Sequence, residues 1–358
     1  MKGLDFYSKR YGNDVAPFLV DIKEREQETT RKDVPANKVR FVSLANAVEK
    51  CKGAENLAKR LNVDISLVED TSNHAKMVVV IDGEPFLLGS SSWVSISGRI
   101  DIYGAGFAAL EPEDKAYVLN ARLRQLDNNN IKVIVVSGKV RAIMSAKYSV
   151  VPADEVFEAI LEKAKERFAD VSCITSYYDH DFSYTKLLFP ELAKKISEAH
   201  GLPDTLIPGL LVVTSDTGHA GIKVTACWQY PQGAFQQADN EVYLRHENSN
   251  GIDKVLDAMP NLFIKYQNAA VKLATMMNIE LKYPATVLKK ACKALGVGDK
   301  YAKSLMVCLP TSNVTAYDIC MEMFSLPARI SCAEAPKLVL EEKVAKAINL
   351  NYEKLDED

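Results

Sequence analysis

The sequence has few cysteines and no cysteine pair of the kind that binds zinc. Seven cysteines occur in 358 residues, and no two of them are spaced as Cys-x-x-Cys. An odd number at ordinary usage excludes a small protein that is held together by disulfides. Cys292 and Cys320 sit at helical, core-like positions, where a free thiol packs as a small hydrophobic side chain. We therefore expect reduced thiols, a cytoplasmic protein and no structural zinc cluster.

Long apolar runs are also missing. The strongest runs, 77–81 and 207–213, are far shorter than the ~20 residues that span a bilayer. The segment Met1–Tyr7 lacks the apolar centre of a signal peptide. These absences predict no membrane segment and agree with a cytoplasmic location.

Neither sign of charge dominates. The chain has 44 basic and 47 acidic side chains, a formal net charge of −3, which argues against a protein that coats nucleic acid by bulk attraction. With 47% hydrophobic and 25% charged residues, the chain is not collagen-like, of low complexity or wholly disordered. The length predicts two or three domains.

The hydrophobic periodicity divides the chain into three parts. Residues 1–42 include a charged, aperiodic stretch, which predicts a flexible polar lead-in. Residues 43–250 alternate helical and strand periods, which predicts one α+β core domain. Residues 251–358 carry helical periods, which predicts a helical C-terminal region that ends in a frayed acidic tail. The expected fold class is α+β, with mainly antiparallel strands packed with helices.

Local signals place the elements within these parts. Ser43 is the predicted N-cap of a helix that reaches Leu61. Asp82-Gly83 and Ser137-Gly138 predict the tight turns of two hairpins. The alternation over 222–230 predicts a half-buried antiparallel strand. Further helices are predicted over 112–126, 154–169, 255–277, 285–295, 299–309, 313–325 and 336–349.

Glycine-rich segments lack the spacing of nucleotide-binding loops. Gly104–Ala109 has the Gly-x-Gly-x-x-Ala pattern of dinucleotide sites, but it lacks the strand-to-helix turn and the acidic residue that such a site needs. Gly296–Lys300 lacks the spacing that wraps a phosphate. The favoured interpretation is plain glycine turns, and no cofactor is expected.

The densest polar cluster lies at 176–184. Asp179 and Asp181 flank His180, so a strand would place both carboxylates on one face and the imidazole on the other. A loop could bring all three groups around a divalent cation. The favoured interpretation is a strand or loop with packed aromatic rings and solvated aspartates, and a further one uses the rings to stack bases.

One segment is strongly basic. Six cations lie between Arg122 and Lys147 against a single acid, Asp127. Over 139–145, strand periodicity predicts that Lys139, Arg141, Ile143 and Ser145 share one face. An arginine and a hydroxyl on one face, just before Tyr148, are suited to bind phosphate and stack a base. The alternative is a solvated face whose arginine holds the next helix. The candidate nucleic-acid-binding residues are Arg122, Arg124, Lys132, Lys139, Arg141, Lys147 and Tyr148.

Several short segments resemble a phage- and plasmid-encoded family. Lys139–Tyr148 is similar to the family's Lys-Val-Arg-Ala-x-x-Ser-x-x-Tyr signature, Gly209–Gly218 to its strand and turn, and Arg245–Asn248 to its Arg-His element. The family is the domain of unknown function 932. Ala226–Tyr230 departs from it, because a Cys-Thr-Asn-Gly type of segment is expected there. The resemblance implies a mobile-element protein and no established reaction.

These observations favour a non-enzymatic accessory protein of a phage, prophage or plasmid that binds nucleic acid, for single-strand binding or annealing in DNA metabolism. One alternative is a host-takeover, anti-defence or virion-associated factor that binds proteins. Another is a metal-dependent hydrolase or nuclease centred on Asp179, His180 and Asp181. The expected partners are single-stranded nucleic acid, phage or host proteins and further copies of the chain in a homo-oligomer, with no membrane.

Overall fold

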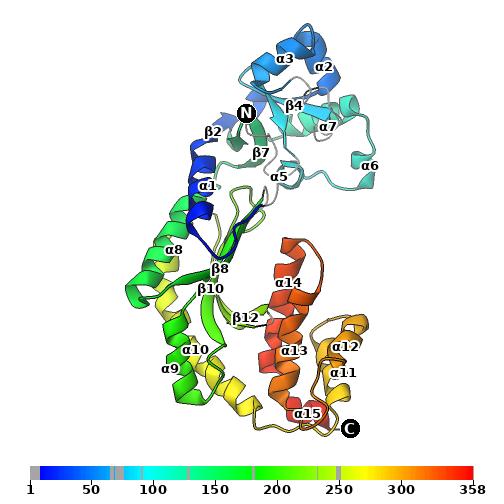
Figure 1. Ribbon diagram of the computed structural model, residues 1–358. Coiled ribbons are helices and arrows are strands. Elements are labelled where there is room, and N and C mark those ends of the chain that lie inside the picture. Colours follow the sequence, from blue (N-terminus) through cyan, green and yellow to red (C-terminus); the bar gives the residue numbers. More distant parts are fainter. Residues whose placement is uncertain are drawn as a thin grey trace.

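Two six-stranded β-sheets carry the fold (Figure 1). The computed structural model describes residues 9–64, 68, 76–89, 92–126, 130–179, 182–231, 233–246 and 251–357. The first sheet has the order β2 (Thr29–Pro35), β6 (Asn130–Val136), β7 (Lys139–Ser145), β5 (Glu84–Leu88), β4 (Met77–Ile81), β3 (Val39–Ser43). The second has the order β1 (Lys9–Arg10), β8 (Ser172–Tyr178), β9 (Ser183–Leu188), β10 (Ile207–Thr214), β11 (Ile222–Tyr230), β12 (Gly233–Leu244). Mainly antiparallel sheets packed against helices confirm the predicted α+β class.

Both hairpins predicted in the first sheet are present. Asp82 and Gly83 join β4 to β5 with φ angles of 49° and 86°. Ser137 and Gly138 join β6 to β7 with φ angles of 48° and 76°. Positive φ at both central positions gives a tight turn whose twist matches that of the flanking strands. Among the described strand pairs, β5 with β7 is the parallel one.

Helices cover both faces of the first sheet. α5 (Ser92–Ile100) and α7 (Pro112–Arg124) pack on one face, and α2 (Leu44–Lys50) and α3 (Ala54–Leu61) pack on the other. As predicted, the Ser43 hydroxyl caps α2 by accepting a hydrogen bond from the backbone N–H of Asn46 at 3.3 Å. The single helix expected to run to Leu61 is wrong, because the chain turns at Lys52 and Gly53, where φ is 57° and 126°. The short helix α6 (Ala105–Ala108) precedes α7.

The second sheet is also covered on both faces (Figure 1). α8 (Ala153–Arg167), α9 (Pro190–His200) and α10 (Asp253–Met276) pack against one face, and α14 (Glu334–Ala345) lies on the other. The antiparallel strand expected over 222–230 is confirmed as β11, but its expected half-burial is wrong. Thr225 and Cys227 of β11, expected to face solvent, are 3% and 1% exposed.

The C-terminal helices share a core with the second sheet. They are α11 (Pro284–Ala294), α12 (Asp299–Met306), α13 (Ala316–Arg329), α14, the short η3 (Lys346–Asn349) and α15 (Tyr352–Asp356). The prediction of a frayed C-terminal tail is wrong for Asp356. Its carboxylate accepts hydrogen bonds from the backbone N–H groups of Lys282 and Tyr283, both at 2.7 Å.

The flexible lead-in expected over 1–42 is wrong for most of its described part. This part contains β1, α1 (Ala16–Gln27), β2, η1 (Ala36–Lys38) and most of β3. α1 buries only Phe18, Ile22 and Arg25, so its apolar stripe is too short to stand out among charged residues. β2 lies at the edge of its sheet and leaves most of its side chains outward, which hides its strand period.

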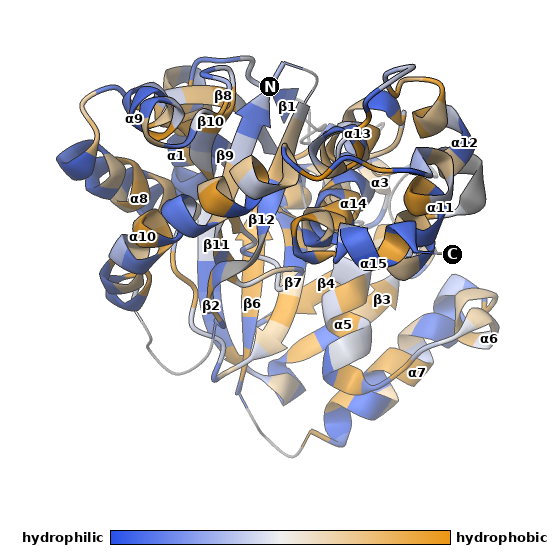
Figure 2. Ribbon diagram, turned by 90° about the horizontal axis from the view of Figure 1, so that it is seen from below, coloured by the Kyte–Doolittle hydropathy of each residue, from blue (hydrophilic) through white to orange (hydrophobic). Residues whose placement is uncertain are grey.

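The molecule thus has two lobes. We call the first sheet with α2–α7 the first lobe, and the second sheet with α1 and α8–α15 the second lobe. Apolar residues run along β3, β4, β6 and β7 inside the first lobe (Figure 2). Within the described residues, no helix has both the length and the apolar character needed to cross a membrane.

Candidate functional sites

The basic segment does not form one exposed surface. Arg141 is 2% exposed. Lys132 donates a hydrogen bond to the carbonyl oxygen of Tyr148 at 2.8 Å. Arg122 donates from Nε to the carbonyl oxygen of Ile100 at 3.2 Å, which holds α7 against the end of α5. Lys139 is half-buried and Tyr148 is buried, so Arg124 and Lys147 are the exposed members of the set.

A β-bulge explains why the expected shared face is wrong. Ala142 pairs with Ile134 and Val140 with Val135, so Arg141 is the extra residue of the bulge. The alternation therefore shifts by one residue at this point. Val140 and Ile143 pack toward α5 and α7, whereas Ala142 lies on the opposite face. Arg141 is thereby confined inside the first lobe.

Tyr148 lies at the junction between the lobes, where three segments that carry the family resemblance meet. Its ring centroid is 5.2 Å from that of His246, and its hydroxyl donates to the carbonyl oxygen of Ser215 at 3.3 Å. The contact is close, since a Cβ atom added at Gly218 would lie 2.3 Å from the Cε atom of Met144. The hairpin of one lobe and the β10–β11 turn of the other are therefore packed directly together.

Buried charges from α1, β2 and this turn lie beside Tyr148. Arg25 Nη2 is 3.4 Å from Asp216 Oδ2, with 6% and 2% of the two side chains exposed. Arg31 Nη2 is 2.6 Å from Glu26 Oε2. Burial, followed by the charge of Asp216, raises the pKa of Glu26, and the Arg31 guanidinium opposes this. Glu26 therefore keeps a proton more readily than an ordinary glutamate.

Several buried polar atoms at this junction have no hydrogen-bond partner among the described residues. They are Glu26 Oε1, Arg31 Nε, both Asp216 carboxylate oxygens and His246 Nε2. His246 Nδ1 is 3.1 Å from the carbonyl oxygen of Ser149, so Nδ1 is assigned the hydrogen and Nε2 the lone pair. Burial lowers the pKa of His246, which favours the neutral ring. The junction offers donors and acceptors to water or a small polar ligand.

The cluster at 176–184 is built around a turn. Asp179 Oδ1 accepts from the backbone N–H of Phe182, and Oδ2 accepts from the Tyr177 hydroxyl, both at 3.0 Å. These bonds hold the turn between β8 and β9. His180 and Asp181 lie outside the described residues. In the described part of the chain, no group of three or more histidine, cysteine and acidic side chains is arranged to hold a metal.

Helices α11 and α12 form a compact pair at the edge of the second lobe (Figures 1 and 2). The turn 295–298 joins them, and Gly296 within it has φ 64°, a left-handed conformation that glycine adopts without strain. The backbone N–H of Val297 donates to the carbonyl oxygen of Cys292 at 2.8 Å, which closes the end of α11. Apolar residues facing inward are Ala291, Cys292, Val297, Ala302 and Leu305, each at most 5% exposed.

The outer side of this helix pair carries lysines. Lys289 and Lys293 of α11 are exposed, as are Lys303 and Ser304 of α12. Val307, directly after α12, is 85% exposed. The sequence contained the signal for this pair, because both helices were predicted. The segment around Gly296, which lies between them, lacks the spacing of phosphate-binding loops, and the sequence predicts a plain glycine turn there.

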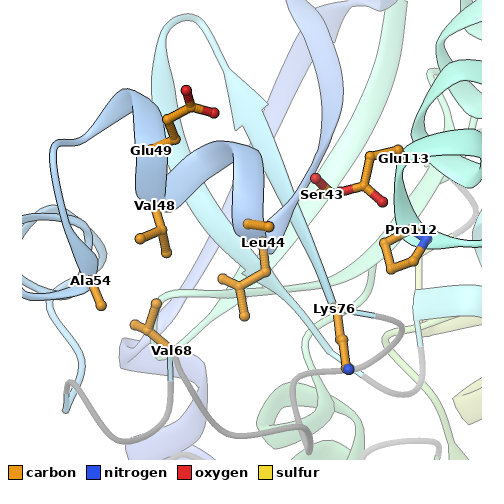
Figure 3. A pocket seen from close by; sticks show the side chains of 10 residues that line it. Ser43, Leu44, Val48, Glu49, Ala54, Val68, Lys76, Pro112 and Glu113 are labelled. Atoms are coloured by element: carbon orange, nitrogen blue, oxygen red, sulfur yellow. The ribbon is translucent and has the colours of Figure 1, made fainter.

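A cavity of about 500 Å³ lies on the first lobe, between α2 and the start of α7 (Figure 3). Its apolar lining comes from Leu44, Val48, Ala54, Val68 and Pro112. The charged residues around it are Glu49, Lys76 and Glu113. The Ser43 hydroxyl is already used as the cap of α2. The cavity is suited to an apolar group, and the described residues that line it do not form a set of catalytic side chains.

Comparison of the chain with protein-family models, with curated proteins and with solved structures finds no match.

Proposed function

We propose that the protein is a non-enzymatic, nucleic-acid-binding accessory protein of a phage, prophage or plasmid, and that α11 and α12 contact the nucleic acid. The observation that carries the proposal is the helix pair itself. It combines a four-residue turn containing a left-handed glycine, buried inner faces and a lysine-bearing outer side. The resemblance of Lys139–Tyr148 to a mobile-element family supports the assignment of origin.

In DNA-binding helix-turn-helix proteins, two helices joined by a short turn that often contains glycine place the second helix in the major groove. The exposed side chains of α12 have suitable chemistry for this. Lys303 can donate to guanine O6 and N7, and the Ser304 hydroxyl, which donates to the carbonyl oxygen of Tyr301 at 2.8 Å, can accept at a base edge. The exposed Val307 side chain can contact a thymine methyl group. Duplex DNA is thus the proposed substrate of this surface, rather than the single strand expected from the sequence.

α11 supplies the backbone contacts in this proposal. Lys289 and Lys293 are exposed one helical turn apart, a spacing that lets both reach the phosphates beside the groove. Each neutralised phosphate releases counterions, so the affinity must fall with salt. The net charge of −3 gives no general attraction to nucleic acid. Binding is therefore confined to this local surface. Arg124 and Lys147 are the exposed cations of the basic segment, and they lie outside the helix pair.

Fluorescence anisotropy with a labelled duplex of about 25 base pairs tests the proposal over a salt series. Lys303→Ala should weaken binding by about 5- to 150-fold, the range for one good base contact of ~1–3 kcal/mol. Lys289→Ala should reduce the slope of log affinity against log salt by about 0.9. Lys59→Ala is the matched control, because Lys59 lies on the first lobe with 72% of its side chain exposed.

Two results would overturn the proposal. The first is a protein that binds neither duplex nor single strand at about 50 mM salt, where phosphate contacts are strongest. The second is a Lys303→Ala variant whose affinity equals that of Lys59→Ala.

A further inference from the structure

The second sheet carries aromatic rings and cations on the face that α14 covers. Tyr177, Phe182 and Tyr184 lie side by side there, with centroid distances of 5.5 Å for Tyr177–Tyr184 and 6.1 Å for Phe182–Tyr184. Lys186 of β9 and Lys223 of β11 stand on the same face. Stacked rings beside cations are the arrangement with which proteins hold single-stranded nucleic acid.

Each cation on this face is paired with a carboxylate of α14. Lys186 Nζ lies 2.7 Å and 2.8 Å from the two oxygens of Glu341. Lys223 Nζ lies 3.3 Å from Glu342 of α14 and 2.8 Å from Glu241 of β12. Glu334 pairs with Arg10 of β1 and accepts from the Tyr184 hydroxyl at 2.7 Å. The acids fall at positions i, i+7 and i+8 of the helix, so α14 presents three carboxylates to the sheet, with Lys337 at i+3 close enough to feel the charges of Glu341 and Lys186.

The N-terminal two turns of α14 combine these polar contacts with the packing of two partly buried side chains, Leu338 against the ring cluster and Leu340 against the main core. The buried residues of the helix are Glu334 and Glu341, with Val344 and Ala345 only in the last turn. Val339, in the middle of the helix, is 54% exposed. A buried ion pair such as Lys186–Glu341 contributes little net stability, because desolvation offsets the attraction. The fully buried apolar residues of α14 therefore lie in its last turn, and its first two turns make charged contacts that another anion can replace.

The sheet beneath α14 is also incompletely satisfied. Thr225 Oγ1 and Gln236 Oε1 are buried and accept or donate no hydrogen bond among the described residues. Both side chains are 3% exposed. The Gln236 amide group does donate to the carbonyl oxygen of Leu338 in α14, at 3.2 Å. Buried polar atoms without hydrogen-bond partners are expected where a bound ligand provides those partners.

We propose that this face is a binding site for single-stranded nucleic acid, and that α14 occupies it as an internal mimic of the strand. In the bound state, phosphates replace Glu334, Glu341 and Glu342 at Arg10, Lys186 and Lys223, while bases stack on the rings that displacement of α14 uncovers. The site uses none of the residues of α11 and α12, so it can be tested independently of duplex binding. An acidic peptide is the competing occupant, which the experiment distinguishes.

The test measures binding of a fluorescein-labelled 25-nucleotide oligothymidine to the full chain at low salt. Glu342→Gln should raise the affinity about fivefold, the upper range for releasing one partly exposed ion pair. Glu342 is 54% exposed, so this variant should fold normally. Lys223→Gln should lower the affinity, and Glu353→Gln on α15 serves as the control, since its side chain is exposed and lies outside this face.

Hydrogen exchange provides the second readout. Oligothymidine should increase exchange in the first two turns of α14 and leave α13 unchanged. The proposal is overturned if Glu342→Gln and Glu334→Gln both bind like the unmodified protein, or if polyglutamate binds the face and oligothymidine does not. These variants should retain duplex affinity, and Lys303→Ala should retain oligothymidine affinity, so failure of one site is distinguishable from failure of the other.

Discussion

Replacing Arg25 by methionine tests whether the buried charges join the two lobes. The substitution keeps most of the volume of the side chain and removes its charge. Arg25 and Asp216 are 6% and 2% exposed and 3.4 Å apart. Neither carboxylate oxygen of Asp216 has a hydrogen-bond partner among the described residues, so the variant leaves this charge buried beside Glu26.

The expected loss is large for one side chain. Breaking a buried pair by removing one partner costs ~3–5 kcal/mol, because the remaining charge is uncompensated. The contact of the Arg25 guanidinium with the Tyr178 ring, 5.9 Å away, is lost as well and falls within that range. Adding Asp216→Asn to the variant removes the orphaned charge and should restore part of the stability, which a double-mutant cycle measures.

Urea unfolding followed by tryptophan fluorescence is a suitable assay. Trp93 lies on α5 in the first lobe and Trp228 on β11 in the second, so each lobe has its own reporter. Lys59→Met is the control, because Lys59 and Glu55 form a pair with 72% and 73% of their side chains exposed, which contributes ~1 kcal/mol or less. If Arg25→Met costs no more than this control, the reasoning about the junction is refuted.

Three further predictions concern single sites. The pKa of Glu26 is raised in the folded protein, so the stability that its protonated form contributes is complete below the ordinary pKa of 4.5 and is lost as pH rises through the folded-state pKa. Thermal melts over a pH series should therefore show a smaller loss of stability with rising pH for Glu26→Gln than for the unmodified protein. Equal slopes for the two proteins would contradict this. Gly209→Ala should lower the free energy of unfolding in urea by ~3 kcal/mol or more, since the added Cβ would lie 2.1 Å from a backbone carbonyl oxygen. Gly106→Ala is its control, because a Cβ there meets nothing within 4 Å and should change that free energy by ~1 kcal/mol or less. Burial raises the pKa of Cys227 to about 12, so a thiol reagent should modify exposed Cys308 and spare Cys227 in the folded protein; equal rates would be inconsistent with the core described here.

Elements with local signals could be predicted from the sequence. Asp82-Gly83 and Ser137-Gly138 specify their turns through positive φ, which needs no distant contact. The Ser43 cap depends on a hydroxyl three residues before the N–H that it accepts from, and it was predicted for the same reason.

Features that depend on distant contacts could not be predicted. α1 is stabilised by packing Phe18 against Phe157 of α8, which its own composition does not reveal. The bulge at Arg141 shifts the alternation of β7, and strict period two has no means of showing such a shift. β11 looks half-buried because Lys223 and Thr225 are polar, yet α14 covers that face with carboxylates.

The candidate sites divide in the same way. The helix pair at 284–306 could be read from two predicted helices and the glycine between them. The junction could not, because Arg25 and Glu26 lie in a segment without periodicity and meet Asp216 only in the folded chain. The paired charges of α14 and the second sheet also join residues far apart in sequence.

The most direct test of the nucleic-acid interface is hydrogen exchange of the full chain with and without a 25-base-pair duplex at low salt. The account predicts slower exchange over α11, the turn 295–298 and α12. Protection centred on 122–148, or no protection anywhere at saturating duplex, would contradict the proposed interface.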